Sequence, residues 1–343
     1  LYGDKMFIAN ATGCSSIWGG SAPATPYTVN KKGHGPAWEN SLFEDNAEFG
    51  LGMTLAQNAV RGRLREYIEN IMNHADCPAD LKTAAAEYLD TMDDTRANGP
   101  KAEALTPKLE ELSKLDCDGA KMAQKILADK DYLAKKSMWI LGGDGWAYDI
   151  GFGGVDHAIA SGENINILVF DTEVYSNTGG QASKATPTGS IAQFAATGKT
   201  MKKKDLAAIA MSYGYVYVAQ IAMGADMNQT IKAFEEAESY NGPSLIIAYA
   251  PCINHGIKGG MGVSMAEEKK AVLAGYWHNF RFDPRRADAG QNPFQLDSKE
   301  PSTSYREFIM GEVRYNSLTR TFPERADVLF AQAEKDATEK YQK

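Results

Sequence analysis

Short apolar runs alternate with helical patterns in the second half of the chain. The apolar runs are residues 137–141, 165–171, 216–219 and 244–249, each bounded by polar or glycine residues. Continuous apolar runs of this length are typical of strands that are covered on both faces. Between them, residues 206–213 and 231–237 carry apolar side chains three and four positions apart, which is the spacing of a helix. Strands that alternate with helices predict an α/β fold with a parallel, doubly wound sheet.

A segment with a different pattern precedes these strands. Residues 56–135 are rich in Ala, Leu, Lys and Glu, and apolar residues recur at helical spacing within 81–89 and 123–127. The segment is charged and is interrupted at Asn98-Gly99-Pro100, so it predicts a helical insertion on the outside of a core domain. Residues 1–55 are rich in Gly, Ser and Asn and predict a pocket wall that is lined by backbone.

Helical patterns return after the last predicted strand. They lie near residues 265–273, 305–318 and 324–341. Residues 256–343 therefore predict a C-terminal helical extension, and we expect residues 1–343 to form one domain.

Composition narrows the class of protein. The 343 residues include 36 Lys and Arg against 44 Asp and Glu, a net charge of −8, which argues against a nucleic-acid-binding surface. No apolar run reaches 18 residues, and the first residues do not resemble a targeting peptide, so we expect a soluble, cytoplasmic protein with no membrane association. Because the chain opens with Leu1 instead of Met, we expect a fragment of a longer polypeptide.

The four cysteines are widely separated. They are Cys14, Cys77, Cys117 and Cys252, and no two form a CxxC pair. This spacing argues against a disulfide framework and against a structural zinc site, which needs closely paired ligands.

The most informative motif follows the first predicted strand of the core. Gly142-Gly143-Asp144-Gly145 places a carboxylate between glycines at a strand end, where α/β sheets bind ligands. Glycine lets the backbone approach a diphosphate, and a carboxylate is a suitable ligand for Mg²⁺. A helix beginning near Gly153 would direct amide groups at the phosphates. A tight turn between strand and helix is the alternative interpretation.

A second polar segment ends the next strand. It begins at Asp171-Thr172, and neighbouring parallel strands present their carboxyl ends side by side, so Thr172 is expected beside Asp144. Residues 146–171, 26 in number, separate Gly145 from Thr172. This arrangement resembles the signature of thiamine-diphosphate enzymes, in which Asn-Asn usually stands where this chain has Asp171-Thr172.

A dinucleotide-binding loop is the competing interpretation. Gly143-x-Gly145 begins a GxGxxG pattern, and Asp171 stands at the next strand end, where such folds hold ribose. The position of the third glycine is occupied by Tyr148, which argues against this reading.

Longer strings resemble the pyruvate:ferredoxin oxidoreductase family. They are Asn10–Gly19, Gly142–Gly151, Asp171–Gln181, Ser183–Gly189, Ala250–His255 and Asn292–Asp297. The resemblance covers essentially the whole chain and matches the C-terminal region of a longer polypeptide. It implies a three-layer thiamine-diphosphate-binding fold and oxidative decarboxylation of pyruvate with coenzyme A, giving acetyl-CoA and CO₂ while electrons pass to ferredoxin or flavodoxin.

The resemblance also implies residue roles. Asp144, Thr172 and the carbonyl of Val174 would hold Mg²⁺. The residues that would contact thiamine diphosphate are Gly13, Cys14, Gly143, Asp144, Gly145, Thr172, Val174 and Asn177. Cys14 and Cys252 would be two of the four ligands of a [4Fe-4S] cluster, the others being a CxxC that the chain lacks, whereas Cys77 and Cys117 would have no role.

Three further features have two interpretations each. Asn177 is expected to stabilise a developing oxyanion as a catalytic residue, or to bond the local backbone. His255 is expected to be a loop residue more often than a site residue. The run Lys202-Lys203-Lys204 is expected to be solvated, or to meet an acidic redox partner.

Alternative functions remain open at this point. Another 2-oxoacid:ferredoxin oxidoreductase would use the same cofactors, and the chain alone would be a non-catalytic cofactor-binding fragment if the remaining domains are needed. The expected partners are pyruvate, coenzyme A, ferredoxin or flavodoxin, the remaining domains of the same enzyme and a second copy in a homodimer.

Overall fold

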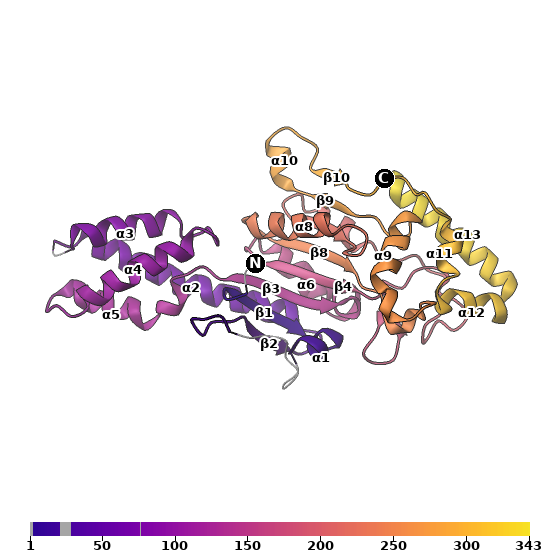
Figure 1. Cartoon of the computed structure of the whole chain (residues 1–343), viewed down its shortest axis with the longest axis horizontal. Helices are drawn as coiled ribbons and strands as arrows, with labels where there is room; N and C mark the ends of the chain where they lie inside the picture. The colour runs from indigo at the N-terminus through magenta and orange to yellow at the C-terminus, as the bar shows by residue number, and fades with distance from the viewer. Residues whose placement is uncertain (1–2, 21–28, 76) are drawn as a thin grey trace. The chain divides into compact units, whose positions relative to one another are not determined.

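The computed structural model describes residues 3–20, 29–75 and 77–343, and these form two compact units (Figure 1). Of the described residues, the larger unit comprises 8–20, 38–49 and 139–343, and the smaller one comprises 3–7, 29–37, 50–75 and 77–138. Within the described ranges, no helix combines the length and apolar composition needed to cross a lipid bilayer.

The smaller unit is a cluster of four helices. They are α2 (Asn46–Asn73), which begins in the larger unit, α3 (Ala79–Asp90), α4 (Asn98–Leu112) and α5 (Asp118–Ala128). Their buried faces enclose Leu64, Ile68, Tyr88, Leu105 and Ile126. Asn98-Gly99-Pro100, which the sequence pattern suggested as an interruption, forms the first turn of α4, where proline is tolerated because its N–H is not needed.

Arg61 links the helices of this cluster through hydrogen bonds in its interior. Its side chain is 8% exposed and donates hydrogen bonds to the carbonyl oxygens of Tyr132, Leu133 and Met92. A guanidinium group can satisfy several carbonyls at once because its five N–H groups are fixed in one plane. Arg61 therefore joins α2 to the chain segments that follow α3 and α5.

The larger unit is built on an eight-stranded sheet in the order β10-β9-β7-β8-β4-β3-β1-β2. Its strands are β1 (Met6–Ala11), β2 (Ala37–Ser41), β3 (Ser137–Gly143), β4 (Asn166–Asp171), β7 (Tyr217–Ile221), β8 (Ser244–Tyr249), β9 (Phe280–Phe282) and β10 (Phe294–Leu296). The pairs β3–β4, β4–β8 and β7–β8 are parallel, and β9 is antiparallel to its neighbours. The predicted α/β class with a mostly parallel sheet is confirmed.

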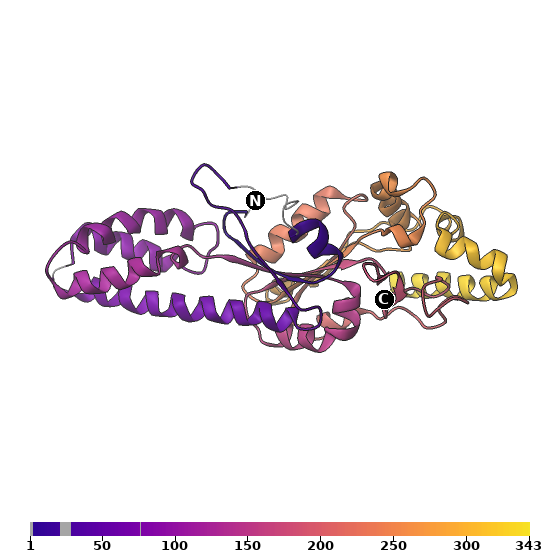
Figure 2. The same cartoon turned by 90° about the horizontal axis from the view of Figure 1, so that it is seen from below.

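Helices cover both faces of this sheet. The chain moves one way along the sheet from β3 through α6 (Phe152–Ala160) to β4, and through α7 (Leu206–Met211) to β7. It then returns through α8 (Met227–Ser239) to β8. Because such crossovers are right-handed, α6 and α7 lie on one face and α8 on the other, as the view in Figure 2 shows.

The N-terminal part of the larger unit is more regular than expected. Residues 1–55 were expected to form a pocket wall, but their described part includes β1, β2, the helix α1 (Cys14–Gly20) and the start of α2. Both faces of β1 are covered, because the consecutive residues Ile8, Ala9, Asn10 and Ala11 are all buried. The residues after β1 still face a cavity, which is described below.

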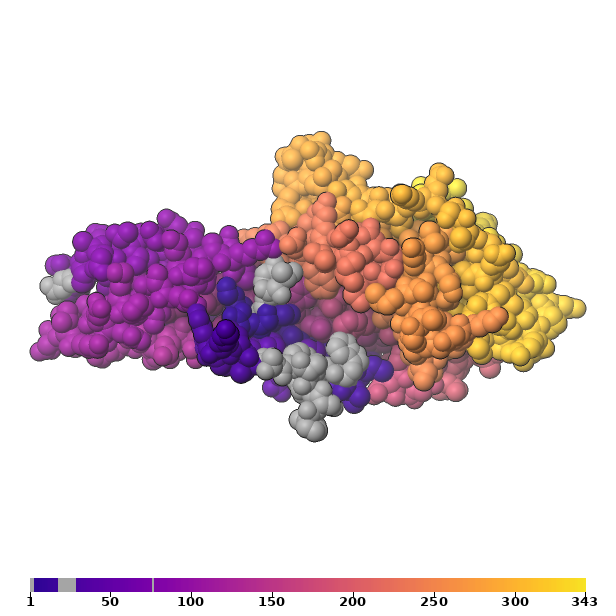
Figure 3. All heavy atoms as spheres, in the orientation of Figure 1, coloured from indigo at the N-terminus to yellow at the C-terminus, as the bar shows by residue number. Residues whose placement is uncertain are grey.

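The C-terminal segment also differs from expectation. Residues 256–343 were predicted to be helical, yet they contribute β9 and β10 to the sheet. The helices are α9 (Ser264–Leu273), α10 (Pro284–Asp288), α11 (Tyr305–Ile309), α12 (Val313–Thr321) and α13 (Pro323–Gln342). The pattern at 305–318 predicted one helix, but the chain turns between α11 and α12. Figure 3 shows these orange and yellow segments as a continuous surface.

Replacing Arg61 should destabilise the helical cluster much more than replacing Arg63, two residues further along the same helix. Arg61→Ala leaves three buried carbonyls without their donor, which should cost about 3 kcal/mol or more of the free energy of unfolding. Arg63→Ala removes only an exposed pair with Asp129 and should cost less than about 1 kcal/mol. Hydrogen–deuterium exchange of the α2–α5 amides measures both, and equal losses of protection would contradict the role of Arg61.

Candidate functional site

A cavity of about 510 Å³ opens where four neighbouring strands end. Residues that follow β1, β3, β4 and β8 line it, which is the edge where parallel sheets bind ligands. Its volume lies in the range of small-molecule sites. All the site residues expected from the sequence line this cavity: Gly13, Cys14, Gly143, Asp144, Gly145, Thr172, Val174, Asn177 and Cys252.

Three oxygen atoms converge at the base of the cavity. Thr172 Oγ1 donates to Asp144 Oδ1 at 2.7 Å and lies 3.0 Å from the carbonyl oxygen of Val174. Neighbouring ligands of an octahedral Mg²⁺ with bonds of 2.0–2.1 Å stand about 2.9 Å apart. The two distances therefore match edges of such an octahedron, and one carboxylate with two neutral oxygens is a chemically suitable donor set for Mg²⁺.

The Asp144 carboxylate has no contact with bulk water. It is 1% exposed, and its second oxygen, Oδ2, accepts a hydrogen bond from Ser183 Oγ. Burial and the nearby Asp171 raise the pKa of Asp144 to about 7, although Ser183, Thr172 and Lys203 act in the opposite direction. A bound cation would favour the charged form, so the site is electrostatically suited to a cation.

The three glycines of the segment 142–145 differ in how much space a side chain would have. A Cβ atom at Gly145 would lie 2.6 Å from the Tyr175 ring, and one at Gly142 would lie 2.3 Å from the Trp146 ring. A Cβ atom at Gly143 would meet nothing closer than the Phe170 carbonyl oxygen at 3.9 Å. Packing therefore requires Gly142 and Gly145, whereas Gly143 stands against open space. After Gly145 the chain forms a π-helix (Gly145–Ile150), and α6 begins at Phe152, close to the expected Gly153.

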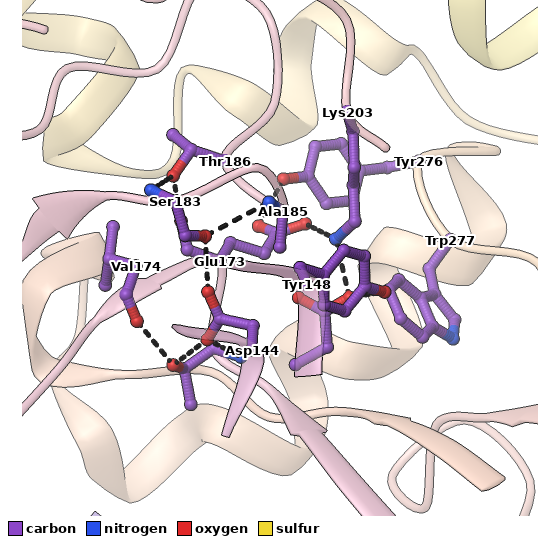
Figure 4. A network of polar contacts seen from close by, with 12 residues as sticks. Asp144, Tyr148, Glu173, Val174, Ser183, Ala185, Thr186, Lys203, Tyr276 and Trp277 are labelled. Carbon is purple, nitrogen blue, oxygen red and sulfur yellow. Dashed lines mark hydrogen bonds and ion pairs between the residues drawn. The ribbon is translucent and has the colours of Figure 1, made fainter. Parts of the chain in front are cut away.

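A buried ion cluster lies behind the cavity, and the sequence analysis missed it. Lys203 Nζ lies 2.8 Å from Asp171 Oδ2 and 2.9 Å from Glu173 Oε1, and both carboxylates are at most 1% exposed. Figure 4 shows Lys203 directed at Glu173, with Tyr148, Tyr276 and Trp277 around it. The expectation that residues 202–204 form a solvated run is therefore wrong for Lys203. The apolar aromatic setting makes full charge pairing necessary, since an unpaired buried charge is costly.

The same cluster argues against a dinucleotide loop. Tyr148, which stands where the pattern requires a third glycine, is buried and donates a 2.7 Å hydrogen bond to Asp171. Asp171 is itself fully buried and paired with Lys203, so its carboxylate is not presented to a ribose.

Comparison with known proteins agrees with the geometry. Residues 118–248 match the family model described as thiamine pyrophosphate enzyme, C-terminal TPP binding domain. The chain is 59% identical over 340 residues to a pyruvate:ferredoxin oxidoreductase of Moorella thermoacetica, covering 98% of this chain and 29% of that protein. It is 55% identical over 341 residues to a pyruvate-flavodoxin oxidoreductase of Klebsiella pneumoniae, covering 99% of this chain and 29% of the relative. The chain is homologous to one segment of the pyruvate:ferredoxin and pyruvate-flavodoxin oxidoreductases.

The resemblance stated from the sequence is thereby confirmed, and the chain spans about 29% of the length of these relatives. Among solved structures, a 2-oxoglutarate:ferredoxin oxidoreductase from Magnetococcus marinus aligns with 93% of this chain and 83% of that chain, at 15% identity and a TM-score of 0.46.

Two of the four cysteines, Cys14 and Cys252, line this cavity. Cys14 is the first residue of α1, and Cys252 follows β8. Burial raises the pKa of the Cys14 thiol, and the nearby Cys252 and Asp144 raise it further. The Cys252 sulfur accepts hydrogen bonds from the backbone N–H and the side-chain amide of Asn254, both at 3.5 Å, and the first of these caps the short helix Ile253–His255. Among the described residues no three Cys, His, Asp or Glu side chains gather around a metal position.

Cys77 and Cys117 lie apart from these two, in the helical cluster. Both are partly buried against its apolar core. A packing role explains them without any metal.

Asn177 and His255 differ in exposure and in hydrogen bonding. Asn177 is exposed at the cavity wall, and within residues 3–20, 29–75 and 77–343 its side chain has no hydrogen-bond partner. It therefore does not bond the local backbone, which was its alternative interpretation. His255 is fully buried, and its Nε2 lies 2.9 Å from the carbonyl oxygen of Thr172. His255 is therefore a satisfied structural residue, as expected, and it holds the backbone of Thr172 beside the cavity.

Two serine residues bond the polar groups of the site, and their residue type and spacing did not predict this role. Ser183 bonds Asp144, and Ser176 Oγ donates to Thr172 Oγ1 at 2.8 Å. Both lie within strings of the family resemblance, which is the one feature that draws attention to them.

Proposed function

We propose that the chain supplies the thiamine-diphosphate and Mg²⁺ site of a pyruvate:ferredoxin or pyruvate:flavodoxin oxidoreductase. The observation that carries this proposal is the convergence of Asp144, Thr172 and the Val174 carbonyl at octahedral edge distances in a cavity of ligand size. The match of residues 118–248 to a TPP-binding domain supports the same cofactor.

The proposed roles follow from position. Asp144, Thr172 and Val174 would hold Mg²⁺, and the open backbone at Gly13, Gly143 and Gly145 would face the cofactor. Thiamine diphosphate, when bound, supplies a nucleophilic carbon and an electron sink for removing CO₂ from a 2-oxoacid. The protein's contribution is a fixed metal site, a largely apolar wall formed by residues such as Phe43 and Phe170, and the amide of Asn177.

Cys14 and Cys252 line the same cavity, which supports a short path for electrons. We propose that they are two ligands of a [4Fe-4S] cluster, whose remaining two thiolates come from outside this chain. Electrons would then leave one at a time to ferredoxin or flavodoxin.

The whole reaction needs parts beyond this segment. Oxidative decarboxylation of pyruvate with coenzyme A, a homodimeric assembly and a cytoplasmic location therefore stay proposals. Relatives named for ferredoxin and for flavodoxin match the chain about equally, so this segment does not determine the acceptor. Steady-state rates with a panel of 2-oxoacids test the proposed substrate, and a preference for 2-oxoglutarate or a branched 2-oxoacid would contradict it.

Asp144→Ala should abolish Mg²⁺-dependent binding of thiamine diphosphate, because it removes the anionic ligand. Thr172→Ala should weaken binding less, since a hydroxyl contributes less to Mg²⁺ than a carboxylate. Isothermal titration with and without Mg²⁺ measures both, with circular dichroism to verify folding. Asp156→Ala is a control on α6, where Asp156 bonds Tyr213 and does not line the cavity, and its affinity should stay near that of the wild type. Unchanged affinity in Asp144→Ala would refute the metal assignment.

Cys14→Ser and Cys252→Ser should each remove one [4Fe-4S] centre from the complete natural protein. Cys77→Ser and Cys117→Ser should leave the iron content unchanged, because these thiols lie in the helical cluster. Iron analysis and visible absorbance of anaerobically purified protein decide the matter. A requirement for Cys77 with a dispensable Cys252 would show that the assignment is wrong.

Asn177→Ala should slow decarboxylation by about 10²–10³-fold while leaving cofactor affinity nearly unchanged, as for the loss of one oxyanion donor. Asn177→Asp should be at least as harmful, because its negative charge repels both the substrate carboxylate and a developing oxyanion. Single-turnover decarboxylation by the complete natural protein, measured beside cofactor titration, separates rate from binding. Weakened binding with a normal rate at saturation would remove Asn177 from the catalytic residues.

A further inference from the structure

The backbone at Glu173 is unusual. Its φ angle is +62°, and among the described residues only Glu173 and Phe194 combine a positive φ with a side chain other than hydrogen. L-residues rarely adopt this left-handed region, and they keep it only where the surroundings enforce it. Glu173 stands between Thr172 and Val174, the two neutral oxygen donors of the proposed metal site.

The kink separates Glu173 from its neighbours. Thr172 and Val174 line the cavity of about 510 Å³, whereas Glu173 lines a second cavity of about 290 Å³ together with Lys203 and Tyr276. The Glu173 side chain therefore points away from the proposed cofactor while its two neighbours point toward it.

Two cations, the buried Arg314 and the partly exposed Lys203, hold the Glu173 side chain in place. Glu173 Oε1 lies 2.9 Å from Lys203 Nζ, and Oε2 lies 2.7 Å from Arg314 Nη2. Tyr276 donates a 2.6 Å hydrogen bond to Oε2, and Figure 4 shows Tyr276 and Lys203 meeting this carboxylate. Burial acts to raise the pKa of Glu173, but Lys203 and Arg314 outweigh it and lower the pKa to about 2. The carboxylate is thus held charged.

A second support fixes the backbone itself. Thr186 Oγ1 donates to the carbonyl oxygen of Glu173, and His255 Nε2 lies 2.9 Å from that of Thr172. Glu312 connects these groups, because it pairs with Arg314 at 2.7 Å and lies 3.6 Å from His255 Nδ1. Side chains from several distant segments therefore bond the tripeptide 172–174.

We propose that Glu173 is a positioning residue for Mg²⁺ and thiamine diphosphate: its ion pairs with Lys203 and Arg314 hold the left-handed kink that aims Thr172 Oγ1 and the Val174 carbonyl at one metal position. Glu173 itself contacts neither the metal nor the cofactor. The inference rests on the proposed function of this site.

The test compares three Glu173 variants of the complete natural protein. Glu173→Ala loses the ion pairs and disfavours the positive φ, so the Mg²⁺ concentration for half-maximal thiamine-diphosphate binding should rise at least tenfold. Glu173→Gly also loses the ion pairs but accepts a positive φ without strain, and it should retain more Mg²⁺ affinity than the alanine variant. Glu173→Gln keeps the shape, loses the charge and should show the smallest rise. If Glu173→Ala does not fold, Glu173→Gln and Glu173→Gly decide the question.

A matched control separates positioning from general stability. Arg281 is 5% exposed and pairs with Asp297 and Glu236, which do not line the cofactor cavity. Arg281→Met should lower the melting temperature and leave the Mg²⁺ requirement unchanged. An equal rise in the Mg²⁺ requirement for Arg281→Met, or no rise in any Glu173 variant, would overturn the inference. Absence of Mg²⁺-dependent binding in the wild type would instead contradict the proposed function.

Discussion

The contact between the Asp144 carboxylate and the Thr172 hydroxyl is the interaction on which the rest of the site depends. It joins the ends of β3 and β4, two neighbouring parallel strands, and it fixes an acidic oxygen 2.7 Å from a neutral one. This contact forms only because the register of the two strands brings residue 143 opposite residue 170. The register of the sheet therefore sets the distance between the oxygen atoms of the proposed metal site.

The site and its surroundings bury four carboxylates, which is unfavourable unless each is paired. Asp144, Asp171, Glu173 and Glu312 are all at most 1% exposed, and unpaired they would be strongly unfavourable. Lys203 and Arg314 compensate three of them within 2.9 Å. Asp144 is the one of the four that is paired only with hydroxyl groups and an amide N–H, so it is the carboxylate left for a cation.

The sequence predicted the parts of the fold and the site that depend on local pattern. Continuous apolar runs identified β3, β4, β7 and β8, and the rule that parallel strands end at one edge correctly predicted Thr172 beside Asp144. Strands β1, β2, β9 and β10 were missed. β9 and β10 have three residues each, too few to show a pattern, and polar residues interrupt the apolar run in β1 and β2. Lys203 was misjudged because a run of three lysines has the pattern of an exposed surface, and only tertiary packing shows which of them pairs with buried carboxylates.

The positive φ of Glu173 and the support from His255 were likewise beyond the sequence. A glutamate carries no signal for left-handed backbone, and residues 173, 203, 255 and 314 meet only after the sheet has formed. Family resemblance supplied the cysteine roles, which spacing alone left open.

The most direct test of this account is a crystal structure of the chain with thiamine diphosphate and Mn²⁺ in place of Mg²⁺. The anomalous signal of Mn²⁺ locates the metal independently of the protein coordinates. The account predicts one peak within about 2.3 Å of Asp144 Oδ1, Thr172 Oγ1 and the Val174 carbonyl oxygen, bridging to the diphosphate. A cofactor bound with its metal elsewhere in the cavity, or coordinated without Asp144, would contradict it.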